Sequence, residues 1–179
     1  MRILLIITCL ANIAFAFGSL PWMPEQIAVH YSPDGTVNRY ESPFFFVALS
    51  CLLPCIIAPF ILGISFMVSF MVMHTPEQFN IPNSDYWMNE ENRPKTARRI
   101  AAFTIDLFGV GIMLFFLFIH GELVRVNLTV PPGQPNVEML LYAFIILLAV
   151  WAFGFVYLYL SFRLPKTEPK NHVENTPPI

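Results

Sequence analysis

A histidine between the first two apolar runs of the chain offers chemistry near neutral pH. His30 is followed by Asp34 and Asn38, and an imidazole can change its charge there, bind a ligand or hold a metal ion. A lone histidine beside a turn also commonly closes a local hydrogen bond, and Asp34 directly precedes Gly35, as in many turns. These three residues are therefore candidates for ligand or partner binding, and a local structural role is the alternative.

A second polar group lies between the second and third apolar runs. Tyr86 and Trp87 are adjacent aromatic residues, and Asn92 and Arg93 follow them. Two rings and a guanidinium could receive a cytoplasmic partner or a nucleotide, although no glycine-rich phosphate loop accompanies them. In the structural alternative the rings lie at a membrane interface and Asn92 caps a helix whose first turn holds Pro94. All four residues are candidate binding residues.

One acidic residue stands inside an apolar run. Asp106 follows Arg99 by seven positions and thus lies on roughly the same helix face. A carboxylate in lipid is costly and usually faces a bundle interior, so Asp106 is a candidate ion or proton site. The alternative is a structural hydrogen bond to Asn12, Ser65 or Ser69, or a position near the headgroups beside Arg99.

No catalytic constellation is complete in the sequence. Catalysis would require paired carboxylates, a nucleophile with its base or clustered metal ligands, and the histidines are dispersed along the chain. Cys51 and Cys55 share a helix face and could form half of a metal site, but no third ligand lies at that depth. We therefore expect no enzyme activity, no cofactor and no metal.

The elements that must position these residues are long apolar helices. Of the 179 residues, 56% are hydrophobic and only 12% are charged, far from the soluble average. The apolar runs occupy 3–20, 44–73, 100–119 and 139–162, each 18 residues or longer and so long enough to cross a bilayer. Residues 1–164 are thus predicted as a single all-α membrane domain of four transmembrane helices. A cleaved signal peptide, with a mature chain beginning near Phe17, is the competing interpretation of the first run.

The basic residues indicate an orientation. Eight of the ten lysines and arginines precede the first run, lie between the second and third, or follow the fourth. Since such residues favour the cytoplasmic side, both termini and the loop at about 74–99 are predicted to be cytoplasmic. Lys95, Arg98 and Arg99 share one helix face that can meet anionic headgroups. The proline-rich segment 165–179 is predicted to be a disordered tail.

The segment at about 21–43 is different in kind from the apolar runs. From residue 26 onward apolar and polar side chains alternate with the period of a strand, and 32–35 suit a type I turn before a return strand at 36–40. A small extracytoplasmic β-hairpin between helices 1 and 2 is therefore predicted. On the same side, Asn127 begins an Asn-Leu-Thr glycosylation sequon, which is incidental in a bacterial protein.

Two strings resemble a known family. The first runs from Leu20-Pro21 through the residues 24–31 to Asp34-Gly35 and Asn38-Arg39-Tyr40, and the second is the stretch 80–93. In this order they resemble a bacterial membrane family of uncharacterised function, whose domain also occurs in the immunity proteins for the sporulation-delaying toxin. Ala28, Pro43 and Glu90 depart from that pattern. The resemblance implies a membrane protein of the toxin-immunity or sensor kind.

Two functions are compatible with these features. The first is a non-enzymatic protein of the bacterial cytoplasmic membrane that binds a ligand, peptide or protein partner through its hairpin and helix bundle. The alternative is a small transporter or channel subunit that uses Asp106 and works as a homo-oligomer or with partners. The bilayer is a partner in both. With a net charge of −2 and no basic stripe, nucleic acid is not expected as a partner.

Overall fold

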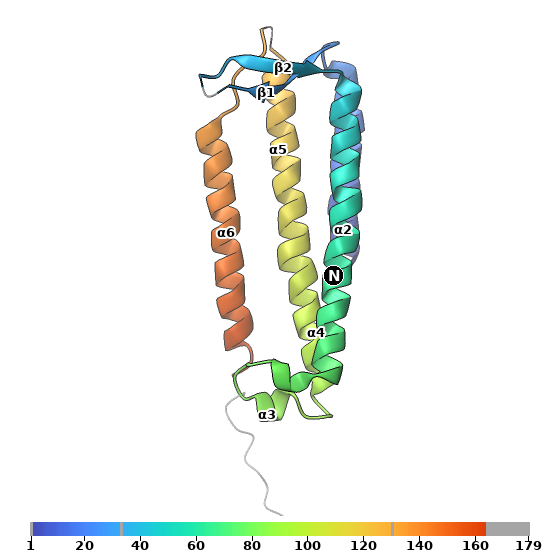
Figure 1. Ribbon diagram of the computed structural model, residues 1–179, viewed down its shortest axis with the longest axis vertical. Coiled ribbons are helices and arrows are strands. Elements are labelled where there is room, and N and C mark those ends of the chain that lie inside the picture. Colours follow the sequence, from blue (N-terminus) through green and yellow to red (C-terminus); the bar gives the residue numbers. More distant parts are fainter. Residues whose placement is uncertain (1, 33, 130, 164–179) are drawn as a thin grey trace, which may run out of the picture.

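The computed structural model describes residues 2–32, 34–129 and 131–163, so the predicted tail lies outside the described residues. The chain forms an elongated helix bundle with a two-stranded hairpin at one end, the hairpin end, and the short helix α3 at the other, the α3 end (Figure 1). Four segments are long and apolar enough to cross a membrane. They are Ile3–Trp22, Pro43–His74, Arg93–Asn127 and Val137–Leu160. The four predicted apolar helices and the predicted hairpin are all present.

The first half of the chain contains two helices with the hairpin between them. α1 (Arg2–Ser19) leads through a single turn, η1 (Leu20–Trp22), into β1 (Ile27–Tyr31) and β2 (Val37–Glu41), which pair antiparallel. α2 (Pro43–His74) follows and continues without a break through Pro54 and Pro59. The return strand begins and ends one residue later than predicted.

The second half contains the longest helical stretch. After η2 (Pro76–Gln78) and α3 (Ser84–Trp87), α4 (Arg93–Phe103), the π-helical η3 (Thr104–Val110) and α5 (Gly111–Asn127) succeed one another without a gap. The 35-residue helix Arg93–Asn127 therefore extends well beyond the predicted run 100–119 at both ends. α6 (Val137–Leu160) completes the fold.

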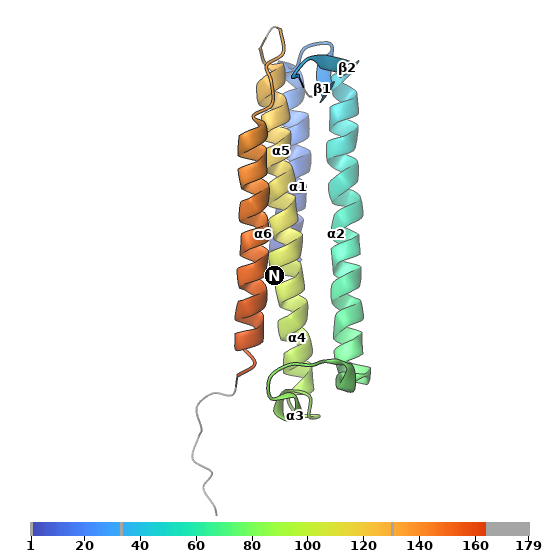
Figure 2. The same cartoon turned by 60° about the vertical axis from the view of Figure 1, so that its left-hand side comes forward.

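α1, α2 and the long helix α4–η3–α5 form the core of the bundle, and α6 lies on one side of it (Figure 2). The three core elements meet at Gly109, where an added Cβ would come within 3.0 Å of side-chain atoms of Leu5 and Ile61. α6 packs mainly on η3 and α5 and has no buried residue within its described length.

Two close contacts hold α6 against the π-helical segment. Gly154 lies so near to Leu107 that an added Cβ would be 2.2 Å from its Cδ2 atom. Three residues earlier, Trp151 Nε1 donates to the Leu107 carbonyl at 3.0 Å. A π-turn shifts the helical hydrogen bonds to i→i+5, so Leu107 gains a side-chain partner where the regular ladder is interrupted.

The bundle has the height of a bilayer with its headgroups. Twenty-seven residues separate Ile100, in the apolar cluster at the α3 end, from Asn127 beneath the hairpin. At a rise of 1.5 Å per residue this is about 40 Å, close to the ~40–45 Å of a bilayer including its interfaces. The two ends of the bundle therefore match the two interfaces of a membrane.

Candidate functional site

One buried side chain attaches the hairpin to the end of α5. Asn127 Oδ1 accepts a hydrogen bond from the Ala28 amide at 2.6 Å, and Asn127 Nδ2 donates to the Ala28 carbonyl at 3.1 Å. The same Nδ2 atom donates to the Leu123 carbonyl at 2.9 Å. Ala28 and Asn127 are 0% and 1% exposed. The Asn127 side chain thus binds both backbone groups of Ala28, as a neighbouring strand would. The sequence interpretation treated Asn127 only as a sequon and missed this role.

The hairpin turn is built by Asp34 and Gly35. Asp34 Oδ1 accepts from the Thr36 hydroxyl at 2.7 Å and from the Thr36 amide at 3.0 Å, and these bonds, the hydroxyl first, lower the pKa of the Asp34 carboxyl. Gly35 has a φ of 84° and lies against Gln134 of the α5–α6 connection. Asp34 is thus used by the turn, as the structural alternative proposed.

The hairpin brings together two of the candidate binding residues, His30 and Asn38. His30 Nδ1 and Asn38 Oδ1 are 2.6 Å apart, and Asn38 Nδ2 donates to Ser32 Oγ at 3.1 Å. Because an amide oxygen can only accept, His30 Nδ1 carries the proton in this contact. Nε2 of the exposed imidazole then remains as an acceptor for a neutral ligand group.

A small cleft opens between this hairpin and the helices below it. Its volume is about 200 Å³. Arg39 at its rim pairs with Glu41 at 2.5 Å and lies over the Phe45 ring, 5.8 Å from its centroid. The lining combines two polar side chains, His30 and Arg39, with the apolar residues Val29, Phe45, Phe46, Leu49 and Leu123. The cleft therefore has an apolar floor and a polar rim.

A buried carboxylate stabilises the connection that supports the hairpin. Glu122, 5% exposed, receives two hydrogen bonds of 2.7 Å from Arg125 and one of 2.7 Å from the Asn136 amide. Nearby, burial raises the pKa of Tyr31, with smaller contributions from Tyr40 and Glu122. Glu122 lies near the hairpin end of the helix Arg93–Asn127, beyond the predicted apolar run 100–119.

Further polar side chains lie inside the core. Asn12, 0% exposed, donates to the Thr8 and Met113 carbonyls at 2.9 Å and so joins α1 to α5. His120, just beyond the predicted apolar run 100–119, is buried in α5 and packs edge-on against Phe46 with ring centroids 5.6 Å apart. Asn12, Ser50 and His120 each keep one buried polar atom without a hydrogen-bond partner among the described residues.

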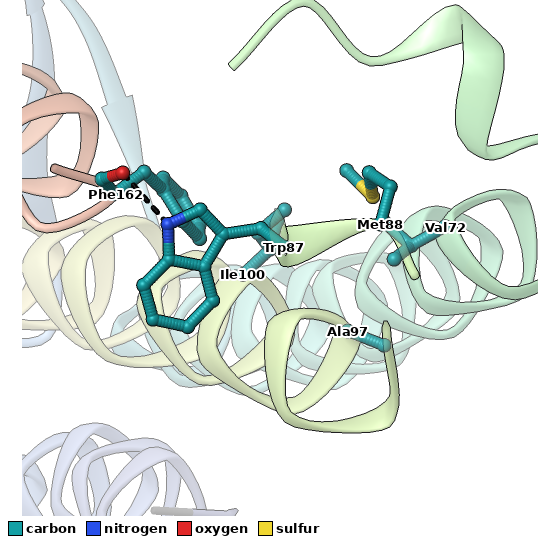
Figure 3. Packing of buried hydrophobic residues seen from close by; sticks show 6 residues of the cluster. All are labelled: Val72, Trp87, Met88, Ala97, Ile100 and Phe162. Carbon is teal, nitrogen blue, oxygen red and sulfur yellow. Dashed lines mark hydrogen bonds between the residues drawn. The ribbon is translucent and has the colours of Figure 1, made fainter. Parts of the chain in front are cut away.

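At the α3 end, Trp87 is part of a packed platform. Its indole Nε1 donates to the Phe162 carbonyl at 2.7 Å, and its ring meets that of Phe162 edge to face (Figure 3). Thr96 Oγ1 donates to the Trp87 carbonyl at 2.9 Å. The surrounding cluster also contains Val72, Met88, Ala97 and Ile100. Trp87 thus ties α6 to α4 and leaves little ring surface for a ligand, being 9% exposed.

The other candidates at this end also bind the chain itself. Asn92 precedes α4 as predicted, but it does not cap the helix through its side chain. The backbone of Asn92 is already helical, and its Nδ2 atom donates instead to the Tyr86 carbonyl at 3.1 Å. Arg93 Nε donates to the Met88 carbonyl at 2.9 Å. Of the four predicted residues only Tyr86 is exposed, so a ligand site is not formed by the group as a whole.

The Arg99 side chain, which was predicted to meet lipid headgroups, also contacts the protein itself. Its guanidinium donates to the Ser161 carbonyl at 2.8 Å and lies 4.8 Å from the Trp87 ring centroid and 5.4 Å from that of Phe162. These contacts connect α4 to the end of α6. They also fix the direction in which the remaining N–H groups point.

Asp106 lines the largest described cleft, which lies between α4–η3 and α6. The cleft has a volume of about 670 Å³ and extends from Arg99 and Ser161 to Gly154. Asp106 Oδ1 has no hydrogen-bond partner within the described residues, so the bonds predicted from Asn12, Ser65 or Ser69 are not formed. Ser65 instead donates to the Ala101 carbonyl at 3.2 Å. Asp106 and Arg99 share the cleft without forming an ion pair in the described structure.

Comparison with known proteins adds one match. Residues 3–58 match the model of a family described as a domain of unknown function, DUF1648. The matched segment contains α1, the hairpin and the first half of α2, and hence the first of the two strings in the sequence. The resemblance to an uncharacterised family is confirmed for this part, and the link to toxin immunity stays a prediction. No curated protein and no solved structure matches the chain.

Proposed function

We propose that the chain is a non-enzymatic protein of a bacterial cytoplasmic membrane that binds an amphipathic peptide at its extracytoplasmic hairpin. The orientation, with both termini in the cytoplasm, rests on the distribution of lysine and arginine. The binding role rests on one observation, the cleft of about 200 Å³ beneath the hairpin.

The size of this cleft favours a side chain as its occupant. Sites for whole small molecules usually measure ~300–1,000 Å³, so 200 Å³ fits one or two large apolar side chains of a longer partner. The floor of Phe45, Phe46 and Leu49 offers apolar burial. At the rim, His30 Nε2 offers an acceptor to a backbone N–H of the same peptide, and Arg39 offers donors to its carbonyls or carboxylates.

The cleft is also pre-organised. Asn127 attaches β1 to α5, and the His30–Asn38 contact fixes the imidazole. Groups that are ordered before binding lose less conformational entropy when the partner arrives. A membrane-active peptide, such as the sporulation-delaying toxin named by the resemblance, is the kind of partner that reaches this level of the membrane.

The experiment tests the proposal by filling the cleft with a larger side chain. The full chain is reconstituted in nanodiscs, and binding of the fluorescently labelled toxin peptide is measured by anisotropy. Leu49→Trp should weaken binding at least about tenfold, since it removes more than about 1.4 kcal/mol of side-chain burial. Leu52→Trp is the matched control, because Leu52 is exposed on the same helix and is absent from the cleft lining.

His30→Ala and Asn38→Ala should weaken binding by a smaller factor, and Asp106→Asn should leave it unchanged. The proposal is wrong if the peptide binds the wild-type protein no better than it binds empty nanodiscs. It is equally wrong if Leu49→Trp and Leu52→Trp bind alike.

A transport function is the second candidate, favoured by Asp106. Asp106 lines a large cleft from a π-helical segment and keeps one buried oxygen without a partner in the described structure, and such segments are frequent at functional sites. If this function holds, proteoliposomes should carry a proton or sodium flux that Asp106→Asn abolishes. A flux that persists in that variant, or none above that of empty liposomes, excludes the role for Asp106.

A further inference from the structure

We propose that the cleft between α4–η3 and α6 is a binding site for an anionic phospholipid of the leaflet at the α3 end. The phosphate would lie on Arg99 and an acyl chain would fill the cleft beyond it. This inference is independent of peptide binding at the hairpin.

The first argument is the fixed guanidinium at the mouth of the cleft. Arg99 donates one N–H group to the Ser161 carbonyl and makes cation–π contacts with Trp87 and Phe162. No acidic side chain pairs with it in the described structure. A guanidinium held in this way presents its other donors to a phosphate with little further loss of entropy.

The second argument is the shape of the cleft behind Arg99. Its lining runs from Ser161 to Phe153 along α6, which corresponds to about 12 Å at 1.5 Å per residue. This is most of one hydrocarbon leaflet, whose depth is about 15 Å. Phe103, Leu107 and Leu158 supply an apolar wall for an acyl chain, and the volume of about 670 Å³ is that of a ligand site.

The third argument is charge. The described ion pairs, Arg39–Glu41 and Arg125–Glu122, both lie at the hairpin end. Among the described residues, Lys95, Arg98 and Arg163 join Arg99 at the α3 end, although Arg98 borders the other cleft, whereas the acids between α2 and α4 lie in the connection 75–92. Each basic residue near a membrane surface attracts anionic lipid by about 1 kcal/mol. An anionic headgroup is therefore favoured over a zwitterionic one.

Asp106 lies deeper than the headgroup in this arrangement. Seven residues, or about 10 Å along the helix, separate it from Arg99. A bound acyl chain would cover its side of the cleft and keep water from the carboxyl. Lipid binding and ion passage at this cleft would then exclude each other.

The chain provides a matched control for Arg99. A second cleft of about 570 Å³ lies on the other side of α4, between α4 and α2, with Arg98 at its edge. Among the described residues, Arg98 donates only to the Pro94 carbonyl of its own helix, at 3.2 Å. It has the same charge as its neighbour but lacks the aromatic support.

The experiment counts lipids on the full chain. Native mass spectrometry of protein released from nanodiscs containing phosphatidylglycerol and phosphatidylcholine should show preferential retention of phosphatidylglycerol. Arg99→Gln should lower this retention about tenfold, as expected for loss of one charge-assisted hydrogen bond. Arg98→Gln should lower it less than Arg99→Gln does, by at most about fivefold, because it removes only the ~1 kcal/mol attraction of a surface charge.

A second measurement needs no variant, since Arg99→Gln also removes a contact with α6. Phosphatidylglycerol with a photoreactive acyl chain, added to the wild-type protein, should label peptides of 99–107 and 153–161 above those of 56–70. Unlabelled phosphatidylglycerol should compete, and phosphatidylcholine should not. Uniform labelling of all exposed helices, equal retention of the two lipids, or equal effects of the two arginine variants would each overturn the proposal.

Discussion

Replacing Asn127 by alanine tests how the hairpin is held. The change removes the partners of the Ala28 amide and carbonyl, which Asn127 binds at 2.6 and 3.1 Å in a site 0% exposed. An unsatisfied buried polar group costs about 1–3 kcal/mol, so two of them weaken the docked hairpin by about 2–6 kcal/mol. Local opening should become about 30- to 20,000-fold more frequent.

Hydrogen exchange of the full chain in nanodiscs measures this opening. Peptides that contain β1 should exchange faster by that factor in Asn127→Ala, while α2 peptides keep their protection as an internal reference. Thr129→Ala is the control, because within the described part of the chain Thr129 Oγ1 donates only to the Val126 carbonyl, although Thr129 belongs to the same sequon. It should leave the exchange of β1 unchanged.

The reasoning is refuted if β1 exchanges at nearly the wild-type rate in Asn127→Ala. Loss of protection in all helices together would refute it in another way, because it would show that the amide supports the whole bundle and not the hairpin alone. Asn127→Asp separates shape from hydrogen bonding, since it keeps an acceptor for the Ala28 amide but presents no donor to the carbonyl.

Three further outcomes follow from contacts described above. Gly154→Val should separate α6 from η3, because its Cβ would lie 2.2 Å from Leu107; pulsed spin-label distances should lengthen, and overpacking costs about 1–3 kcal/mol. Trp151→Phe removes the hydrogen bond to Leu107 and should lower unfolding stability in detergent by about 1 kcal/mol. Since the hydroxyl and amide of Thr36 lower the pKa of Asp34 from 3.8, its contribution to the turn is fully present above pH 3.8 and is lost as the pH falls through the lowered pKa, which the Thr36 amide shift should report in NMR spectra.

The sequence was sufficient to predict the apolar helices and the hairpin. Hydropathy over 18 or more residues is a strong signal because lipid requires every backbone group to be paired within the helix. The turn at Asp34-Gly35 was predicted equally well, because glycine readily adopts the positive φ, here 84°, that this turn requires. The apolar helices and the turn are determined mainly by residues close to one another in the sequence.

The end of the third long helix was not predicted, for a physical reason. His120, Glu122 and Asn127 count as polar in a hydropathy window, which ended the expected run at residue 119. Glu122 is satisfied by Arg125 and by the Asn136 amide, and Asn127 by a residue 99 positions away. A window of sequence contains no information on such distant partners.

The candidate binding residues show the same limit of sequence reasoning. Trp87, Asn92 and Arg93 have the donors of a ligand site, but their acceptors are carbonyls of this chain. The residue type shows what a side chain can donate, and only the fold shows what receives it. His30 and Asn38 were both candidate binding residues, and their mutual contact at 2.6 Å was not predicted from the sequence.

The π-helical segment sets the phase of the longest helix. One residue of an α-helix turns the chain by about 100°, and a π-turn accommodates one extra residue, so α4 and α5 present faces offset by about that angle. A one-residue deletion within Thr104–Val110 would restore a regular helix while rotating α4 against α5. Arg99 would then turn away from Ser161, and Ala97 from the platform. Changes of length in this segment should therefore damage the protein more than most changes of residue type.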